Sequence, residues 1–254
     1  MSVRRALVRP PGRTYAKALT RQTPAPAVDL ERAREQHAGY VRALRQTGVE
    51  VFELPPDDVH PDAVFVQDRA CILGERAIFG RSAVPSREGE EAPILEVLER
   101  HFPAVKLEAP ACLDWGDVLI AEDRLFVGRS ERSNEEAVSQ LQSILAPRGS
   151  VTAVPLPENL LHLLSGCSYL GDGSLLAIGS LTEFAKEHRF AVVPVPSDEE
   201  AGANVLTLES DVIVPAGYPR TAGAIARTGR RVCAVSMSEF EKRDGGVTCL
   251  SILY

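Results

Sequence analysis

The sequence predicts an α/β fold built from five repeated units that close into a ring. Three observations support this: tight hairpins recur, amphipathic helices and short apolar strands follow them, and both ends of the chain read as single strands. The hairpins begin near residues 70, 117, 168 and 204. A period of roughly 35–50 residues is typical of propellers and other repeat arrays. No low-complexity linker or change of composition interrupts the chain, so we expect one domain over residues 1–254.

Each predicted hairpin places turn-forming residues between two apolar runs. The turns read Gly-Glu, Glu-Asp, Gly-Asp-Gly and Glu-Ser-Asp in chain order. Because such residues adopt the backbone conformations that reverse a chain tightly, the flanking runs are expected to pair as antiparallel strands. The hairpins span Ala70–Gly80, Asp117–Gly128, Ser168–Gly179 and Asn204–Pro215.

Helices and further strands are predicted between the hairpins. The amphipathic helices are Leu30–Gln46, Glu91–Arg100, Ser133–Leu145 and Pro219–Arg227. We expect Ser133 to cap the third of them, with Glu136 completing a capping box. Short β-rich runs fit buried strands at Ala104–Leu107, Val151–Leu156, Phe190–Pro194 and Arg231–Val235.

The fifth unit is expected to combine the two ends of the chain. Its parts are an N-terminal strand, a helix, a second strand and a C-terminal strand, at Arg4–Val8, Leu30–Gln46, Val49–Leu54 and Thr248–Tyr254. Pairing of the two terminal strands would close the ring. Loops that converge on the axis of such a ring are the usual place for a binding site.

Composition and charge narrow the class of protein. Hydrophobic residues make up 44% and charged residues 25%, with a formal net charge of −7, which is ordinary for a soluble globular protein and argues against a nucleic-acid binder. The segment MSVRRALVRPPGR lacks the apolar run of a signal peptide, and no stretch approaches the ~20 apolar residues that span a membrane. Five scattered cysteines form no CxxC pair and no zinc spacing. We therefore expect a reduced, cytoplasmic protein.

Cys249 and His162 are the first candidates for chemistry. A thiol is a good nucleophile once a neighbouring base or cation ionises it, although a cysteine on a β-rich strand is more often buried filler. His162 stands among leucines in NLLHLLSG. Such a histidine is either a core residue with satisfied hydrogen bonds or an acid/base in a dry site whose pKa one partner sets. The residues alone leave both interpretations open.

Two pairs of acids form the next candidates. Asp114 and Asp117 flank a glycine in LDWGDVL, where they suit a turn or, alternatively, the orientation of an imidazole and the binding of a cation. Asp62 and Asp68 lie on either side of an Ala-Val-Phe-Val run. In a regular strand they would share one face, an arrangement that is costly unless the two carboxylates meet a cation. Solvated acids at the ends of a strand are an equally good explanation.

Taken together, several segments resemble the dimethylarginine dimethylaminohydrolase family of the guanidino-modifying, pentein-fold superfamily. The resemblance covers nearly the whole chain, and VSMSEFEKRDGGVTCLS is its most specific part. The other segments are DLERAREQHAGYVRALRQTGVEVFELP, PDAVFVQD, PSR, LDWGDVL, FVGRSERSN, LHLLSGCS and LLAIGS. It implies a five-bladed α/β propeller of ββαβ units, which agrees with the repeat pattern, and hydrolysis of N-methylated arginine to citrulline and an amine.

The resemblance also implies roles for individual residues. The catalytic set would be Cys249 as nucleophile, His162 as general acid/base and Asp114 as the carboxylate that orients the histidine. The resemblance implies substrate contacts in the same way. Asp68 would bind the guanidinium, and Asp62 with the carbonyls of Leu19 and Arg243 would bind the α-ammonium. Arg87 and Arg132 would bind the α-carboxylate, and the remaining substrate-binding residues would be Phe65, Gln67 and Asp244. Arginine commonly binds a carboxylate through two parallel hydrogen bonds. No metal or organic cofactor is implied.

Three positions depart from the family pattern. Trp115 precedes Gly116 where a second glycine is usual, which places a large side chain beside Asp114 and could block the site. Gln67 stands where an acid is common, and Arg243 replaces an apolar residue, adding a cation near a cationic substrate. These differences put the substrate preference in question more than the reaction class.

Three alternatives to this function are kept. Another guanidine-modifying reaction, such as deimination of free arginine, fits the same scaffold, although arginine deiminases usually carry an inserted helical module that this chain lacks. An inactive protein that binds arginine analogues, and a purely structural propeller with an inert Cys249, are the other two. The expected partner is a small guanidine amino acid, with neither nucleic acid nor membrane. Edge-strand pairing would allow a homodimer.

Overall fold

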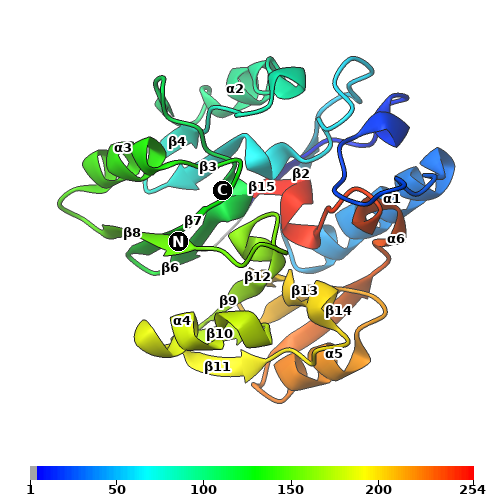
Figure 1. The fold of residues 1–254 in the computed structure, drawn as a ribbon. Helices are drawn as coiled ribbons and strands as arrows, with labels where there is room; N and C mark the ends of the chain where they lie inside the picture. The colour runs from blue at the N-terminus through cyan, green and yellow to red at the C-terminus, as the bar shows by residue number, and fades with distance from the viewer. Residues whose placement is uncertain (1–4) are drawn as a thin grey trace.

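The computed structural model describes residues 5–254, so Arg4 of the predicted first strand lies outside the described residues. Within that range the strands form five sheets of three strands each, arranged in a ring (Figure 1). The strands are β1 (Arg5–Val8) and β2 (Glu50–Glu53); β3 (Ala70–Leu73), β4 (Arg76–Phe79) and β5 (Ala104–Lys106); β6 (Val118–Ala121), β7 (Arg124–Arg129) and β8 (Ser150–Pro155); β9 (Cys167–Gly171), β10 (Ser174–Ala177) and β11 (Ala191–Pro194); β12 (Leu206–Leu208), β13 (Asp211–Pro215) and β14 (Arg231–Val235); and β15 (Ser251–Leu253).

Every sheet repeats one pattern of pairing. An antiparallel pair is followed by a helix and then by a strand parallel to the middle one, as in β3–β4–β5 and β6–β7–β8. Hairpins close four of the antiparallel pairs, while the fifth, β15–β1, joins the two ends of the chain. A crossover helix is needed to bring the next strand back in parallel. The predicted five-unit α/β propeller is therefore confirmed.

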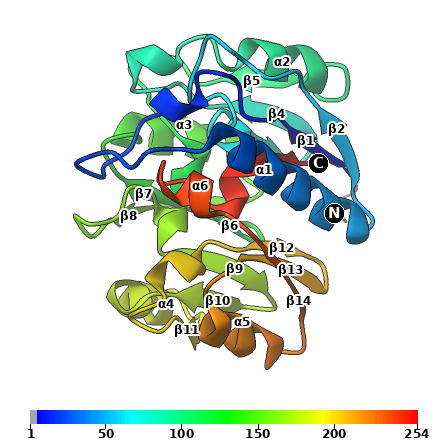
Figure 2. The same ribbon diagram turned by 90° about the vertical axis from the view of Figure 1, so that its right-hand side faces the viewer.

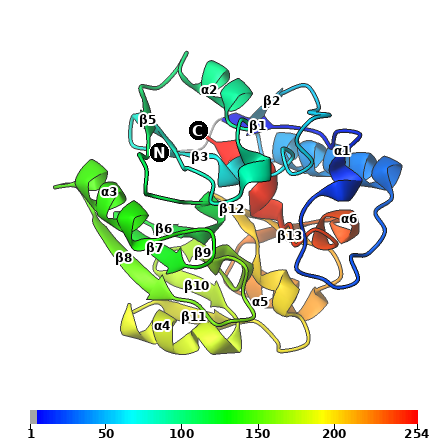
Figure 3. The same ribbon diagram turned by 45° about the horizontal axis from the view of Figure 1, so that its top comes forward.

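Helices lie around the outside of the ring, with the strands nearer its centre (Figure 3). They are α1 (Leu30–Gln46), α2 (Ala92–Leu98), α3 (Glu135–Leu145), α4 (Thr182–Glu187), α5 (Pro219–Ala226) and α6 (Ser238–Glu241). The sequence did not predict α4 and α6, because helices of six and four residues are too short to show a helical period. No helix in residues 5–254 has the length and apolarity that a membrane crossing requires.

The start of α3 differs from the prediction. Asn134 caps this helix, and its side chain accepts a hydrogen bond from the backbone N–H of Ala137 at 3.1 Å. Ser133 instead donates its hydroxyl to Asp117 at 2.7 Å. The expected capping box is wrong because a buried carboxylate competes for the serine hydroxyl.

The ring closes by pairing of the two terminal strands. Strand β15 runs antiparallel to β1, with Ala6 opposite Leu253, and β1 runs parallel to β2 (Figure 2). The N–H of Arg5 donates to the carbonyl of Tyr254 at 2.7 Å, and the N–H of Tyr254 donates back at 2.9 Å. Closure removes two sheet edges that would otherwise be exposed.

Two segments that were predicted as strands form short 3₁₀ turns. Val66–Asp68 is the 3₁₀ helix η2, preceded by a turn, and Val247–Leu250 is η8, so that β15 begins only at Ser251. The side chain of Asn204 explains the second case. Its amide accepts from the N–H of Thr248 at 3.0 Å and donates to the Thr248 hydroxyl at 2.8 Å, which keeps this backbone out of a β-ladder.

Candidate active site

A small cavity lies where four 3₁₀ turns meet at the centre of the ring. They are η2, η4 (Trp115–Asp117), η5 (Leu163–Ser165) and η8, and they contact one another in pairs. The cavity has a volume of about 120 Å³. Of the residues that the sequence suggested for the site, all but Gln67 and Asp117 line it: Leu19, Asp62, Phe65, Asp68, Arg87, Asp114, Arg132, His162, Arg243, Asp244 and Cys249. The ring therefore brings together groups that lie up to 230 positions apart, from Leu19 to Cys249.

Cys249 lies within η8 and is only 8% exposed. Its sulfur accepts a hydrogen bond from the backbone N–H of Gly246 at 3.4 Å. Burial, with a further contribution from the negative charge of Asp68, raises the pKa of the Cys249 thiol to about 12. The sulfur is therefore protonated at neutral pH until a positive charge comes close to it.

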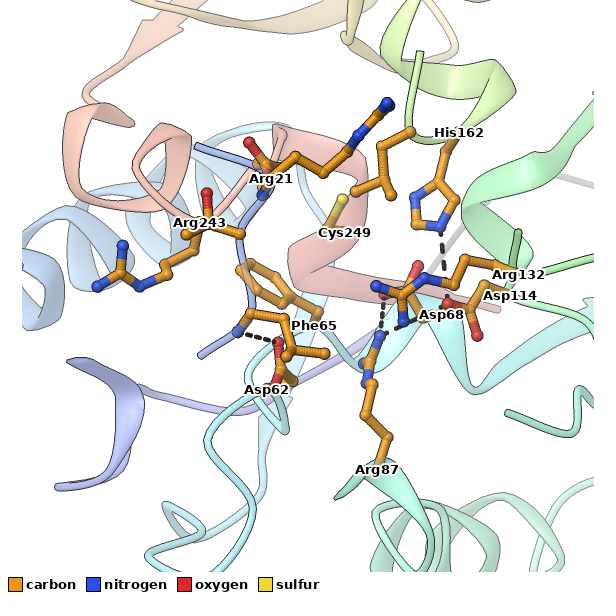
Figure 4. Close-up of a pocket in the computed structure, with 15 residues that line it drawn as sticks. Arg21, Asp62, Phe65, Asp68, Arg87, Asp114, Arg132, His162, Arg243 and Cys249 are labelled. Carbon is orange, nitrogen blue, oxygen red and sulfur yellow. Dashed lines mark hydrogen bonds and ion pairs between the residues drawn. The ribbon is translucent and has the colours of Figure 1, made fainter. Parts of the chain in front are cut away.

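His162 lies directly before η5 and faces Asp114 (Figure 4). Its Nε2 is 3.6 Å from Oδ2 of Asp114. Burial alone would lower the pKa of His162, but pairing with Asp114 and the nearby charges of Asp68 and Asp117 outweigh burial and raise it above its usual 6.5. The imidazole thus keeps its proton to a higher pH than a free histidine, which suits a general acid.

Gly116 is what lets the imidazole approach so closely. A Cβ atom at position 116 would lie 2.6 Å from Nδ1 of His162 and 3.0 Å from Oδ1 of Asp68. A contact of 2.6 Å essentially never occurs for a Cβ atom, so any side chain here would displace the histidine. The glycine after Trp115 therefore has a steric role in the site.

A fully buried network of charges lies beneath these residues. Arg87 donates to Asp68 at 2.8 Å and to Glu90 at 3.0 Å, and Arg69 donates to Asp114. Burial opposes the charge on Asp114, but the guanidinium of Arg69 and the pairing with His162 prevail and lower its pKa. Asp114 therefore stays ionised opposite the histidine.

Sequence reasoning missed Arg69 and Glu90. Arg69 directly follows Asp68, and Glu90 lies three residues after Arg87 in PSREGE. An Arg-x-x-Glu spacing and an arginine inside the apolar stretch VFVQDRACIL were the available signals. Both side chains are at most 2% exposed, which is rare for these residue types unless they are paired.

Arg87 is placed differently from Arg132. Its guanidinium is shared among Asp68, Glu90 and, at 3.7 Å, Asp114. Among residues 5–254, no carboxylate forms an ion pair with the guanidinium of Arg132, and this side chain lines the cavity (Figure 4). Of the two arginines expected to bind a carboxylate, Arg132 is the one with its charge available.

Asp62 lines the opposite part of the cavity from His162 (Figure 4). Its Oδ1 accepts a hydrogen bond from the N–H of Leu19 at 3.1 Å. Burial raises the pKa of Asp62, although Arg87 counteracts part of this effect. A second cation in this part of the cavity would relieve the cost of burying the carboxylate.

The three departures from the family pattern have structural explanations. Trp115 is 1% exposed and packs in the core against β6 and β7, so it does not block the cavity. Gln67 donates its amide to the Trp115 carbonyl at 2.9 Å, outside the residues that line the cavity. The guanidinium of Arg243 points away from Cys249 and donates to the carbonyls of Ala16 and Lys242, each at 2.7 Å (Figure 4).

Asp117 stabilises the backbone around the site. Its carboxylate accepts hydrogen bonds from the hydroxyls of Ser130 and Ser133 and from the N–H of Leu163. It does not line the cavity. Of the two acids in LDWGDVL, Asp114 therefore faces the histidine, and Asp117 fixes the backbone that carries it.

Two neighbours of Leu19 that the sequence did not single out also line the cavity. Thr20 and Arg21 line it, together with Leu161 and Gly245. The N–H of Arg21 donates to Asp244 at 2.6 Å, and its guanidinium donates to the carbonyl of Glu158 at 2.8 Å. Apart from the family resemblance that implied Leu19, nothing in the local sequence RTYAKALTRQ points to this position, because only the closed ring brings the segment to the site.

Asp68, Asp114 and His162 offer possible metal ligands within 4.8 Å of one another. Both carboxylates are already paired with guanidinium groups, Asp68 with Arg87 and Asp114 with Arg69. Two arginines therefore already supply the positive charge that this cluster needs. That no metal is required stays a prediction.

Known proteins resemble this chain over nearly its whole length. A family model described as N,N dimethylarginine dimethylhydrolase, eukaryotic, matches residues 16–149. An N(G),N(G)-dimethylarginine dimethylaminohydrolase of Pseudomonas aeruginosa is 37% identical over 98% of this chain and 98% of its own length. The Streptomyces coelicolor protein of that name is 38% identical over 99% and 97%. A solved structure of the Pseudomonas enzyme, a variant complexed with citrulline, superposes with a TM-score of 0.95 at 36% identity, covering all of both chains. The chain is therefore a member of the dimethylarginine dimethylaminohydrolase family.

Proposed function

We propose that this protein hydrolyses N-methylated arginine, as asymmetric dimethylarginine or monomethylarginine, to citrulline and dimethylamine or methylamine. The observation that carries the proposal is that one buried cavity holds a thiol and an imidazole between carboxylates and an available arginine. A zwitterionic amino acid with a cationic side chain matches this distribution of charge. The citrulline bound to the related Pseudomonas structure supports the same class of product.

The two ends of the substrate would bind to different groups. Arg132, with Arg87 behind it, would bind the α-carboxylate. Asp62 and the carbonyls of Leu19 and Arg243 would bind the α-ammonium. Asp68 would bind the guanidinium, and Phe65 and Asp244 would complete the walls. This arrangement fixes the central guanidinium carbon near the sulfur, and positioning of this kind lowers a barrier by several kcal/mol.

The bound guanidinium would also ionise the nucleophile. Because burial and Asp68 hold the thiol in its protonated form, a cation beside the sulfur favours the thiolate. The thiolate of Cys249 would attack the central carbon, and protonated His162 would give its proton to the departing amine. The covalent thiouronium would then react with water that the neutral imidazole activates, releasing citrulline.

Product analysis tests this proposal directly. The purified protein is incubated with asymmetric dimethylarginine, monomethylarginine and arginine in separate reactions, and citrulline, alkylamine and ammonia are measured. We expect citrulline with dimethylamine or methylamine. Ammonia from plain arginine as the main product would instead make the protein a deiminase.

Cys249→Ser tests the covalent route. This variant is expected to fold and to bind substrate without turnover, because a serine hydroxyl is far harder to ionise than a thiol. Substantial hydrolysis by the serine variant would refute a thiouronium intermediate.

We further propose that the protein works as one catalytic domain in the cytoplasm. All five cysteines are free, which fits a reducing compartment.

If the protein forms a homodimer, we propose that the exposed edge strand β2 is its interface, because Phe52 on this strand is 49% exposed. Light scattering behind size-exclusion chromatography would show whether Phe52→Lys converts a dimer to a monomer.

A further inference from the structure

A second pocket meets the first at the reacting residues. Cys249 and His162 line both cavities. The second has a volume of about 340 Å³, against about 120 Å³ for the first. The thiol and the imidazole therefore line two spaces. The smaller one carries Asp62, Asp68 and Arg132, which are proposed to bind the amino acid, and Asp244 lines both.

The walls of the second pocket differ in character from those of the first. Its lining includes the apolar side chains of Leu160, Leu161, Leu164 and Ala201 together with the carboxylates of Glu241 and Asp244. Arg21 also lines it, and its guanidinium donates to the carbonyl of Glu158 at 2.8 Å. An apolar wall beside acidic groups suits an alkylamine, which has apolar carbon atoms and gains a positive charge when it is protonated.

The proposed chemistry directs one product toward this pocket. His162 gives its proton to the nitrogen that leaves, so the leaving nitrogen must lie beside the imidazole. The amino-acid part of the substrate fills the smaller cavity. The substituents on the leaving nitrogen then extend to the other side of the histidine, where the second pocket begins.

The size of the pocket exceeds the need of a dimethylamine group. A methyl group is about as large as a water molecule, whose share of liquid volume is ~30 Å³. A pocket of about 340 Å³ therefore has room for several more carbon atoms. Nothing in its lining closes it at the size of two methyl groups.

We propose that the second pocket receives the N-alkyl group of the substrate and the amine released from it, so that arginines carrying N-alkyl groups larger than methyl, such as N-butylarginine, are hydrolysed. This inference rests on the proposed function. The thiolate, its proton lost to solvent, forms the S–C bond while the C–N bond to the alkylamine breaks, and His162 protonates the departing nitrogen. Water then forms the C–O bond, His162 takes a proton from it, and the S–C bond breaks. The sum is alkylarginine plus water giving citrulline plus alkylamine.

The test compares N-methylarginine with N-butylarginine in the wild-type protein. We expect the two values of kcat/KM to lie within about tenfold of each other, since added methylenes in an apolar pocket change transition-state binding only moderately. Mass spectrometry identifies citrulline and butylamine as products. Turnover of the methyl compound without the butyl compound overturns this inference and leaves the proposed function intact. Turnover of neither overturns both.

A second test of the proposal fills the second pocket with a larger side chain. Ala201 is exposed and lines only the second pocket, so Ala201→Trp adds bulk there without disturbing the core. We expect kcat/KM for N-butylarginine to fall at least about tenfold and that for N-methylarginine by less than about threefold. The matched control is Ala226→Trp, an exposed alanine at the end of α5 that lines neither pocket. Equal losses for both substrates would overturn the inference.

A second substitution covers a failure of the first variant to fold. Ser165→Phe fills the same pocket from η5, next to Leu164. Circular dichroism first confirms that each variant keeps its secondary structure. The expected selectivity against the butyl substrate is the same, and its absence from both variants would count against the proposal.

Discussion

At Gly116 the absence of a side chain decides where the imidazole of His162 can lie. A Cβ atom there would be 2.6 Å from Nδ1, so Gly116→Ala must move the histidine. Because a displacement of about 1 Å costs about 100-fold in rate, we expect kcat to fall about 100-fold. Gly179→Ala is the control, since a Cβ at position 179 meets no atom within 4 Å. Steady-state kinetics with thermal melts of both variants would check this, and an active Gly116→Ala protein would contradict it.

The ion pair between Asp114 and His162 predicts the pH dependence of turnover. The pKa of His162 is raised in the folded protein, so the proton needed by the leaving amine is present below this raised value and is lost as the pH rises through it. Asp114→Asn removes the main stabilising partner, and the alkaline limb of the kcat profile is expected to move to lower pH. Profiles of both proteins measure the shift. A limb at unchanged pH would show that another group controls it.

Arg132 is expected to act mainly in binding. Its guanidinium has no ion pair among the described residues, whereas Arg87 is shared by three carboxylates. A charge-assisted hydrogen bond contributes about 1.5–3 kcal/mol, so Arg132→Ala should raise KM by about 10- to 100-fold and change kcat little. Arg129→Ala, a nearby exposed arginine, serves as control. An unchanged KM would remove Arg132 from the site.

Some site residues could be identified from the sequence and others could not. Cys249, His162 and Asp114 could be identified because they stand in recognisable motifs. Arg69 and Glu90 could not, because their role depends on a buried network whose members come together only in space. For Trp115 the sequence left open whether its side chain would block the site, and the structure places that side chain in the core.

Among the elements, Asn204 joins the turn that carries His162 to the turn that carries Cys249. Its amide donates to the carbonyl of Leu164 at 2.9 Å and bonds Thr248 twice. Asn204→Ala leaves these buried groups without partners, each at a cost of about 1–3 kcal/mol, and lets the turns separate. We expect a loss of about 2–3 kcal/mol in the free energy of unfolding together with a lower kcat.

Urea denaturation and steady-state kinetics measure the two effects. Asn159→Ala is the control, because Asn159 is exposed, lines the same second pocket and makes no side-chain hydrogen bond in the described structure. If the two variants behaved alike, the connection between the turns would be unimportant.

Hairpins were the most predictable elements, and the 3₁₀ turns were the least. A hairpin depends on a few residues in a row, so its signal is local. The turns η2 and η8 read as strands because Val, Phe and Thr favour extended structure, yet contacts with distant groups such as Asn204 decide their conformation. These turns carry the site, which is why its detailed geometry was beyond sequence reasoning.

For the whole molecule, closure of the ring links stability to catalysis. Ile252 of β15 is 2% exposed, lies opposite Leu7 of β1, and follows Cys249 by three residues. Ile252→Ala creates a cavity at the seam and is expected to cost about 2–5 kcal/mol. It should also lower kcat under conditions where the protein is still folded, because β15 positions η8.

Ile94→Ala is the matched control for this prediction. Ile94 is fully buried in the same core cluster as Ile252 but belongs to helix α2, not to the seam strands β1 and β15. Both variants should lose similar stability in urea denaturation, and only Ile252→Ala should lose kcat at low temperature. Equal activity would mean that the seam does not govern the position of the nucleophile.

The position of Cys249 along the chain has a consequence for biosynthesis. Every other residue that lines the first cavity precedes it, and β15 follows it directly. A chain still emerging from the ribosome therefore carries every other residue of the cavity before it carries the nucleophilic sulfur. Such a nascent chain cannot attack a guanidine. The first citrulline would be released only after Cys249 and β15 have been translated and the ring has closed.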